Sequence, residues 1–488
     1  MYLGIDIGTS AIKAVLVDEA QQIIGQAAHP LEVLRPQPLW SEQRPEDWWR
    51  GTCAVLTELQ HQHPTRIAAV RGIGLSGQMH GATLLGLDDA VLRPAILWND
   101  GRSGPQCGEF ERRAPRSRAI TGNLAMPGFT APKLLWVAQH EPDVFRRVAR
   151  VLLPKDYVRL RLSGEYVSDM SDASGTLWLD VGRRQWSAEM LAATGLTEAA
   201  MPRLCEGSEA SATLRAEIAT EHGMGRSIVI AGGAGDNAAG AVGVGVIRPG
   251  QAFLSLGTSG VYFVAGAAFM PKPERAVHAF CHSVPRTWHQ MSVILSAASC
   301  LSWVTALTGG RDEAAMLAEI EAADTPSDVL FLPYLSGERT PHNDPHAKGV
   351  FCGLTHSTTR ADLGRAVLEG VAFALADGQE ALLASGARID EVCVIGGGAR
   401  SAYWGKILAS VLGRPVHYCV GGEVGPAFGA ARLARLAVTG EDPVAVCTPL
   451  PVERVVEPDA SLQRRYAERL EVYRGLYQQL RGTFATLA

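Results

Sequence analysis

The pattern of hydrophobic and polar positions predicts a tight β-hairpin at the start of the chain. Apolar residues over 4–7 and again over 14–17 form two short strands, and the turn Gly8-Thr9-Ser10 lies between them. The same order of strand, Gly, Thr and Ser returns over 253–260, near the midpoint. A plain structural turn explains one such hairpin, but the repetition indicates two related halves.

Further along, the pattern predicts an alternation of strands and helices. Buried strands are expected over 71–76, 227–231 and 392–395. Amphipathic helices are expected over 45–59, 362–384 and 461–480. Each of the three strands runs into glycine or polar residues, which is typical of ligand loops at strand ends in α/β proteins.

Polar side chains follow two strand ends in the first half. His80 lies between glycines after the strand over 71–76, and Asn99, Asp100 and Arg102 follow the strand at 96–97. Adjacent strand ends would bring these groups to one region, which suits a polyol. A structural histidine remains the alternative for His80, but its position between glycines favours ligand contact.

The strand over 227–231 leads through the Gly/Ala passage 232–235 to Asp236, at the entry of an Ala/Gly-rich helix. Phosphoryl transfer needs held phosphates, a metal ion and a carboxylate that accepts the proton of the attacking hydroxyl. The two Gly-Thr-Ser turns can hold anions through backbone N–H groups. Asp6 can hold a cation directly or through water, and Asp236 is the candidate base. A helix N-cap is the alternative role for Asp236, and one residue can serve both.

The turn Gly396-Gly397-Gly398 could belong to a Rossmann dinucleotide site. That fingerprint needs spaced glycines in an early βαβ unit and an acidic residue about twenty positions further on. Here the glycines are contiguous and late, and Glu423 is not at the expected distance. Consecutive glycines do suit a purine that lies against bare backbone.

Length and composition narrow the class of protein. A chain of 488 residues is longer than one hydrophobic core supports, so we expect two domains, 1–245 and 246–488. The net charge of −5 argues against nucleic-acid binding. The nine cysteines include no C-x-x-C pair, which argues against a zinc site or a disulfide framework. No apolar run reaches membrane-spanning length and no cleavable signal is evident, so we expect a cytoplasmic protein without membrane partners.

Several of these motifs together carry a family resemblance. The paired Gly-Thr-Ser turns and the late Gly-Gly-Gly-Ala turn resemble the actin, hexokinase and Hsp70 ATPase superfamily. Within it, residues 130–136 (TAPKLLW), 349–354 (GVFCGL) and 368–370 (LEG) are similar to the FGGY carbohydrate kinases. The resemblance implies an α/β fold with two ribonuclease H-like domains and an active site in the cleft between them. The first domain would bind the sugar and the second the nucleotide. The resemblance also allows the last helix to pack back on the first domain, and it allows a homodimer.

The loop 77–81 and the segment 235–240 resemble the family members that phosphorylate D-xylulose with ATP and Mg²⁺ in xylose catabolism. The resemblance implies that Asp236 is the base and that Asp6 holds Mg²⁺ through water. The implied sugar contacts are Met79, His80, Asn99, Asp100 and Asn237. The implied nucleotide contacts are Thr9, Ser10, Thr258, Gly397 and Gly398. Some relatives place an Asn shortly after the glycine turn, where this chain has Ala402.

Two rival functions remain at this point. One is another FGGY activity, on ribulose, gluconate or glycerol. The other is an ATP-driven conformational switch of the Hsp70 or actin kind, to which Asp236 and the polar strand ends would be superfluous. Glu338-Arg339-Thr340 receives no role from the sequence beyond a position at the domain hinge.

Overall fold

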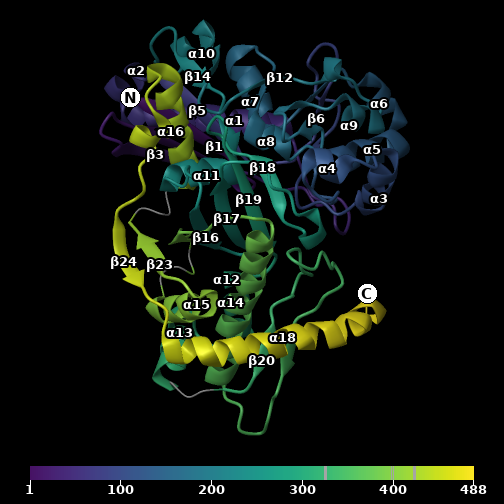
Figure 1. Ribbon diagram of the computed structural model, residues 1–488. Coiled ribbons are helices and arrows are strands. Elements are labelled where there is room, and N and C mark those ends of the chain that lie inside the picture. The colour runs from purple at the N-terminus through teal and green to yellow at the C-terminus, as the bar shows by residue number, and fades with distance from the viewer. Residues whose placement is uncertain (324–326, 397, 399–400, 421–424, 488) are drawn as a thin grey trace.

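The computed structural model describes residues 1–323, 327–396, 398, 401–420 and 425–487. Figure 1 shows two α/β halves, one above the other, each built on a mixed β-sheet. No helix within these residues is long and apolar enough to cross a membrane.

The first sheet is a meander extended by parallel strands. Its order is β13-β14-β5-β1-β2-β3, in which β1, β2 and β3 pair antiparallel while β5 pairs parallel to β1 and β14 parallel to β5. The bounds are β1 (Tyr2–Ile7), β2 (Ala11–Val17), β3 (Ile23–Pro30), β5 (Gly72–Gly77), β13 (Ala210–Thr213) and β14 (Val229–Ala231). The hairpin predicted around Gly8 is therefore confirmed.

The second sheet repeats the six-strand order of the first and adds β18 at one edge. Its order is β18-β19-β17-β16-β22-β23-β24, and β16, β17 and β19 form the antiparallel meander while β22 and β23 extend it in parallel. The bounds are β16 (Gln251–Leu256), β17 (Gly260–Gly266), β18 (His278–Cys281), β19 (Trp288–Ile294), β22 (Glu391–Ile395), β23 (Val416–Cys419) and β24 (Val452–Val456). This shared topology confirms the two related ribonuclease H-like halves.

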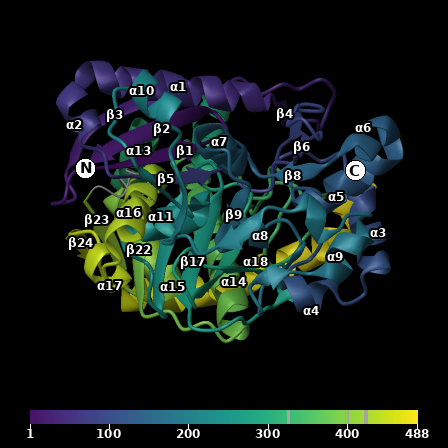
Figure 2. The same cartoon turned by 90° about the horizontal axis from the view of Figure 1, so that it is seen from above.

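Helices cover both faces of the first sheet. Leu3, Ile5 and Ile7 of β1 share a core with residues of α1 (Pro45–Gln62) and α7 (Pro154–Ser163). The opposite face, with Tyr2, packs on α16 (Gly425–Thr439), which also contacts α11 (Asp236–Val244). Figure 2 shows α1 on one side of these strands and α11 and α16 on the other.

The helix α16 approaches the first sheet so closely that only glycine fits beneath it. A Cβ atom at Gly4 would lie 1.8 Å from the carbonyl oxygen of Ala427, and one at Gly74 would lie 1.8 Å from that of Ala430. The two glycines let helix and strand backbones come into direct contact. A helix from late in the chain therefore completes the first half.

The last helix, α18 (Ala460–Thr486), packs on the second half instead of the first. It contacts α14 (Arg360–Ala384), α15 (Ala402–Leu412) and β20 (Leu330–Leu332), and Figure 1 shows it along the end of the lower half. Its buried aromatic residues, among them Tyr466 and Tyr473, belong to the second core. The expectation that the last helix packs on the first domain is therefore corrected. The helix from the second half that packs there is α16.

A smaller lobe lies between β5 and β14 in the sequence. Its core residues, among them Phe129 and Trp178, form one cluster with Phe253 and Phe263 of the second sheet, so the two halves share an apolar contact. Its elements are β6 (Thr83–Leu85), β7 (Ala95–Ile96), α3 (Gly104–Arg113), α4 (Ser117–Thr121), α5 (Thr130–His140), α6 (Pro142–Arg147), β8 (Arg150–Leu152), β9 (Val167–Asp169), α8 (Met170–Ser174), β10 (Leu179–Asp180), β11 (Gln185–Trp186), α9 (Ala188–Ala193) and β12 (Arg203–Cys205). The helix α10 (Ala216–Glu221) packs instead in the core of the first sheet.

The remaining elements are short pieces or helices of the second half. They are β4 (Glu42–Gln43), α2 (Pro64–Ala68), β15 (Ala234–Gly235), α12 (Ala298–Leu307), α13 (Glu313–Ala323), β21 (Val350–Cys352) and α17 (Pro443–Val446). The helix α14 begins at a capping box between Thr359 and Asp362.

Candidate active site

Three strand ends of the first sheet meet in one row. In the parallel register, Ile7 of β1 pairs with Gly77 of β5, and Gly77 pairs with Gly235 of β15. The next residues, Gly8, Gln78 and Asp236, therefore leave the sheet at the same edge. This geometry brings together the first glycine turn, the predicted sugar loop and the predicted base.

Asp236 is the first residue of α11 and is half-buried. Its Oδ1 accepts hydrogen bonds from the backbone N–H of Asn237 at 2.7 Å and from the Asn237 side-chain amide at 2.9 Å. Its Oδ2 has no hydrogen-bond partner in the described part of the chain. Burial, reinforced by the charge of Asp6, raises the pKa of Asp236 to about 7. The N-cap position belongs to Gly235, so the alternative role of Asp236 as an N-cap is wrong.

Asp6 lies near the end of β1 and is buried. It faces Lys13 across the hairpin and Ser76 on the neighbouring strand. Burial raises the pKa of Asp6 to about 6, although Ser76 and Lys13 oppose the shift. Its buried Oδ1 has no hydrogen-bond partner within the described residues. A carboxylate oxygen left without a donor fits the outer shell of a hydrated Mg²⁺, which commonly uses one or two carboxylates and keeps several waters.

The backbone of His80 is held in an unusual conformation. Its φ of 71° lies in the left-handed region, which a side chain other than glycine seldom adopts. The carbonyl oxygen of His80 accepts a hydrogen bond from the Lys133 amino group at 2.9 Å and another from the Thr130 hydroxyl at 3.2 Å. These two residues come from the TAPKLLW motif, and their contacts fix the loop that carries His80.

The ring of His80 has a defined tautomer. Burial lowers the pKa of His80 to about 3, so the imidazole is neutral near pH 7. Nδ1 lies 2.7 Å from the carbonyl oxygen of Gly175, so Nδ1 carries the hydrogen and donates it. Nε2 is then a hydrogen-bond acceptor, which suits a sugar hydroxyl. A purely structural histidine, the alternative role, would also make the hydrogen bond to Gly175. This bond by itself therefore does not distinguish the two roles.

Met79 separates the His80 ring from the loop before Asp236. A Cβ atom at Gly235 would lie 2.9 Å from the Met79 Cγ, and one at Gly175 would lie 2.9 Å from its Cε. The buried side chain of Met79 therefore packs against both glycines. The predicted neighbourhood of Met79, His80 and Asp236 is thus present in the fold.

The second half also contributes to this region. The strand β18 carries His278 and Phe280, whose rings lie within 6.4 Å of the rings of Phe129 and His80 respectively. The Arg339 guanidinium lies 3.4 Å from Nε2 of His278. His278 is not predicted from the sequence, because no local motif marks it. Arg339 belongs to Glu338-Arg339-Thr340, to which the sequence assigned no role. Only the folded structure shows that Arg339 contacts His278.

Two of the other predicted sugar contacts, Asp100 and Asn237, already bind protein groups, and the third, Asn99, is exposed. Asp100 is buried and accepts a hydrogen bond from the Ser41 N–H at 2.6 Å while it forms an ion pair with Arg102 at 2.7 Å. Asn99 is exposed. Asn237 binds Asp236. These three residues therefore remain predictions as sugar contacts, and Asp100 has a structural partner for each oxygen.

The two Gly-Thr-Ser turns differ in the hydrogen bonds of their threonines. The Thr9 hydroxyl donates to the Gln78 side chain at 3.2 Å and accepts from the Trp98 indole at 3.0 Å, whereas Ser10 is exposed. Thr258 is exposed, and its carbonyl oxygen accepts from the N–H of Ala297 at 2.9 Å. Phosphate contact at the first turn would therefore depend on backbone N–H groups and Ser10 more than on the Thr9 side chain.

Of the predicted nucleotide-binding turn Gly396-Gly397-Gly398, the structure describes Gly396 and Gly398. A Cβ atom at Gly398 would lie 2.9 Å from the Cβ of Leu256, so the glycine is required for close packing there. Ala402 begins α15, and Ser401 caps it by accepting from the Trp404 N–H at 3.1 Å. Gly397 and Glu423 lie outside the described residues.

Comparison with known proteins identifies the family. Residues 1–243 match the model of the N-terminal domain of the FGGY family of carbohydrate kinases, and residues 252–438 match that of the C-terminal domain. The chain is 55% identical to the xylulose kinase of Escherichia coli (strain K12) over 482 residues, 98% of this chain and 99% of that one. It is 34% identical to the xylulose kinase of Bacillus subtilis (strain 168), covering 97% and 96% of the two chains.

Solved structures agree with these sequence matches. The crystal structure of xylulose kinase from Rhodospirillum rubrum superposes with a TM-score of 0.92 at 30% identity and covers 99% of each chain. The glycerol kinase of Plasmodium falciparum with ADP superposes with a TM-score of 0.88 at 20% identity, covering 98% of this chain and 97% of that one, which indicates a shared fold. The chain belongs to the FGGY family of carbohydrate kinases.

Proposed function

We propose that this protein transfers the γ-phosphoryl group of ATP to the 5-hydroxyl of D-xylulose and releases D-xylulose 5-phosphate and ADP. The observation that carries the proposal is the row of strand ends that sets Asp236 beside the loop of Met79 and His80. The full-length identity of 55% to the E. coli xylulose kinase supports xylulose as the sugar.

Asp236 is the general base in this proposal. Its pKa of about 7 lies close to neutral pH, where a base combines a populated ionised form with useful basicity. Asn237 holds Oδ1, so Oδ2 takes the proton from the sugar hydroxyl. The sugar oxygen forms a bond to the γ-phosphorus, and the bond between that phosphorus and the ADP oxygen breaks.

The phosphates of ATP lie between the two Gly-Thr-Ser turns in this proposal, near Ser10 and Thr258. Asp6 would hold Mg²⁺ through water, since its buried Oδ1 has no donor among the described residues. When bound, Mg²⁺ would offset the negative charge of the phosphates. Gly398 would lie beneath the adenine nucleotide.

The sugar binds mainly to the first domain. His80 accepts a hydrogen bond from a sugar hydroxyl at Nε2, while Met79 bounds the pocket on the side of Asp236. We place the boundary at 245/246, with α16 as the part of the second domain that packs on the first. Closure of the two domains would exclude water, which competes with the sugar hydroxyl for the phosphoryl group.

The same proposal places the enzyme in the cytoplasm, where ATP is available, and assigns it to xylose catabolism. A homodimer is the proposed assembly. Light scattering after size-exclusion chromatography measures the mass directly, and a single-chain mass at micromolar concentration would contradict the dimer.

A substrate panel tests the function. D-xylulose, D-ribulose, D-gluconate and glycerol are compared by kcat/KM in an assay that couples ADP release to NADH oxidation. We expect D-xylulose to exceed each of the others by about a hundredfold, because a site built for particular hydroxyls leaves polar groups unpaired with the wrong sugar. A preference for glycerol or gluconate would overturn the substrate. ATP turnover that no sugar stimulates would favour the ATP-driven switch.

A further inference from the structure

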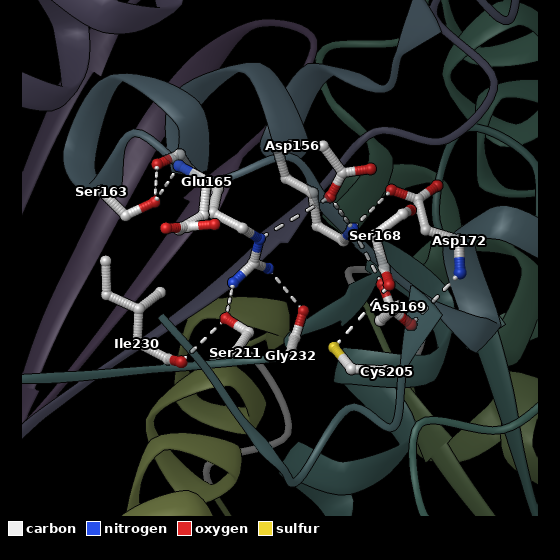
Figure 3. A network of polar contacts seen from close by, with 12 residues as sticks. Asp156, Ser163, Glu165, Ser168, Asp169, Asp172, Cys205, Ser211, Ile230 and Gly232 are labelled. Atoms are coloured by element: carbon white, nitrogen blue, oxygen red, sulfur yellow. Dashed lines mark hydrogen bonds and ion pairs between the residues drawn. The ribbon is translucent and has the colours of Figure 1, made fainter. Parts of the chain in front are cut away.

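A cluster of five charged side chains is completely buried behind the row of strand ends. Lys155, Asp156 and Arg159 belong to α7, Asp169 ends β9, and Asp172 lies on α8, and all five side chains are 0% exposed. Figure 3 shows the carboxylates of Asp156, Asp169 and Asp172 turned toward one another. The Lys155 ammonium lies 2.6 Å from Asp156, 2.8 Å from Asp169 and 3.1 Å from Asp172.

The charges of this cluster nearly balance. Burial raises the pKa of Asp172 well above its usual range, while the charge of Lys155 opposes that shift. Burial alone would lower the pKa of Lys155, but the three surrounding acids raise it, so the ammonium stays charged. Taking ions out of water costs free energy that their mutual attraction often fails to recover. Stability alone is therefore a weak reason for such a cluster, and its contacts indicate a positional role.

The loop that ends at Asp236 has no polar side chain with which to hold its own conformation. It consists of Gly232, Gly233, Ala234 and Gly235, and Gly233 has a φ of 77°. A Cβ atom at Gly232 would lie 2.0 Å from the carbonyl oxygen of Glu206, so glycine is required there. Glycine loses more backbone entropy on ordering than any other residue. The conformation of this loop must therefore be imposed by its surroundings.

The cluster contacts both ends of the glycine loop. At the first end, the Arg159 guanidinium donates to the carbonyl oxygens of Ala231 at 2.6 Å and Gly232 at 2.5 Å, and Figure 3 shows Gly232 with Ser211 beside the cluster. At the second end, the Ser171 hydroxyl donates to Asp169 and accepts the N–H of Gly235 at 3.1 Å. Gly235 directly precedes Asp236, so this bond lies one residue from the proposed base.

We infer that Asp169 and Ser171, supported by Lys155, are positioning residues that fix the amide of Gly235 and thereby place Asp236 against the sugar hydroxyl. The inference rests on the proposed role of Asp236 as base. The chain runs from the Lys155 ammonium to the Asp169 carboxylate, to the Ser171 hydroxyl and to the Gly235 N–H. An error of about 1 Å in the position of a reacting group can cost about a hundredfold in rate, which makes such a chain consequential.

The test compares two buried serines. Ser171→Ala removes the bond to Gly235, whereas Ser168→Ala removes a buried hydroxyl that has no hydrogen-bond partner among the described residues. We expect Ser171→Ala to lower kcat about tenfold, with KM for ATP and for D-xylulose within about twofold of the parent. We expect Ser168→Ala to keep kcat within about twofold, and both variants to melt within a few degrees of the parent. Equal kcat values for the two variants would overturn the inference.

A second background separates positioning from general damage. In Asp236→Asn, the base is absent and its placement no longer matters, so adding Ser171→Ala should change the residual turnover by less than about twofold. A tenfold loss in both backgrounds would show that Ser171 acts independently of Asp236 and would overturn the inference. Near-normal turnover of Asp236→Asn alone would instead overturn the proposed base. Loss of activity in Asp236→Asn together with a normal Ser171→Ala would overturn only the positioning role.

Discussion

The negative charge of Asp6 raises the pKa of Asp236, although the two residues are 230 positions apart in the chain. They meet because β1 and β15 flank β5 in the same parallel register. Burial contributes more to the shift than Asp6 does, and the hydrogen bonds from Asn237 oppose it. The result is a carboxyl group that titrates near neutral pH.

The pH dependence of the reaction should report this coupling. For the free enzyme, kcat/KM for D-xylulose should fall as the pH is lowered through about 7, because protonated Asp236 cannot accept the hydroxyl proton. Removing the charge of Asp6 lowers the pKa of Asp236, so the residual activity of Asp6→Asn should keep its plateau to a lower pH. Initial rates at low sugar concentration between pH 5 and 9 measure both profiles.

Asp88→Asn is the control for that experiment, since Asp88 is an exposed carboxylate in a turn. Its profile should coincide with that of the parent. An acidic limb of Asp6→Asn that stays in place, or that moves to higher pH, would contradict the coupling.

Ionised Asp236 should reduce the stability of the folded protein. Its pKa is raised from 3.8 to about 7 on folding, so the native state holds a proton that the unfolded state has released between these values. The free energy of unfolding therefore falls as pH rises through that window. Asp236→Asn removes this loss, so it should melt at a higher temperature than the parent at pH 8, with the difference shrinking toward pH 4. Thermal melts followed by circular dichroism provide the measurement, and a variant that is less stable at pH 8 would count against it.

Lys133 should matter for sugar binding without touching the sugar. Lys133→Met removes the amino group that donates to the His80 carbonyl oxygen, so the left-handed backbone at His80 loses one of its two supports. We expect KM for D-xylulose to rise about tenfold while KM for ATP changes little, as a weakened positioning contact of about 1–2 kcal/mol would give. Lys272→Met is the matched control, because Lys272 is partly exposed and, among the described residues, forms an ion pair only with Glu274, at 4.0 Å. An unchanged KM for D-xylulose in Lys133→Met would remove the proposed support.

The contact between α16 and the first sheet should not tolerate a methyl group. Gly74→Ala would place a Cβ 1.8 Å from the Ala430 carbonyl oxygen, so helix and strand must separate. We expect a loss of about 3 kcal/mol or more in the free energy of unfolding, the upper range for overpacked sites. Urea unfolding followed by tryptophan fluorescence measures it.

Gly475→Ala on α18 provides the opposite control, since a Cβ there meets no atom within 4 Å. We expect a gain of about 0.5–1 kcal/mol from helix propensity. Equal stabilities for Gly74→Ala and Gly475→Ala would mean that α16 does not pack as described.

The sequence predicted the parts of the site that depend on local pattern. The strand before Gly8, its repeat before Gly257 and the loop before Asp236 are all marked by apolar runs that end in glycine. Hydrophobic periodicity also located α1 and α14, although not which half the last helix would join.

The rest depends on contacts between distant residues. Lys133 reaches the carbonyl of His80 across 53 positions, and Ser171 meets the N–H of Gly235 across 64. Asp100 resembled a sugar ligand because it ends a strand, yet its oxygens bind Arg102 and Ser41. Such assignments need the folded arrangement, since composition and spacing do not determine which polar groups satisfy each other.

The position of α16 has a consequence for how the chain is made. When the ribosome has added residue 245, every strand of the first sheet has been synthesised, but the helix that covers one of its faces begins only at Gly425. The apolar surface around Tyr2 and Val15 therefore waits for about 180 further residues before its partner emerges. The nascent first half is thus an incomplete folding unit, and it is completed only when a helix about 180 residues further along the chain has been synthesised.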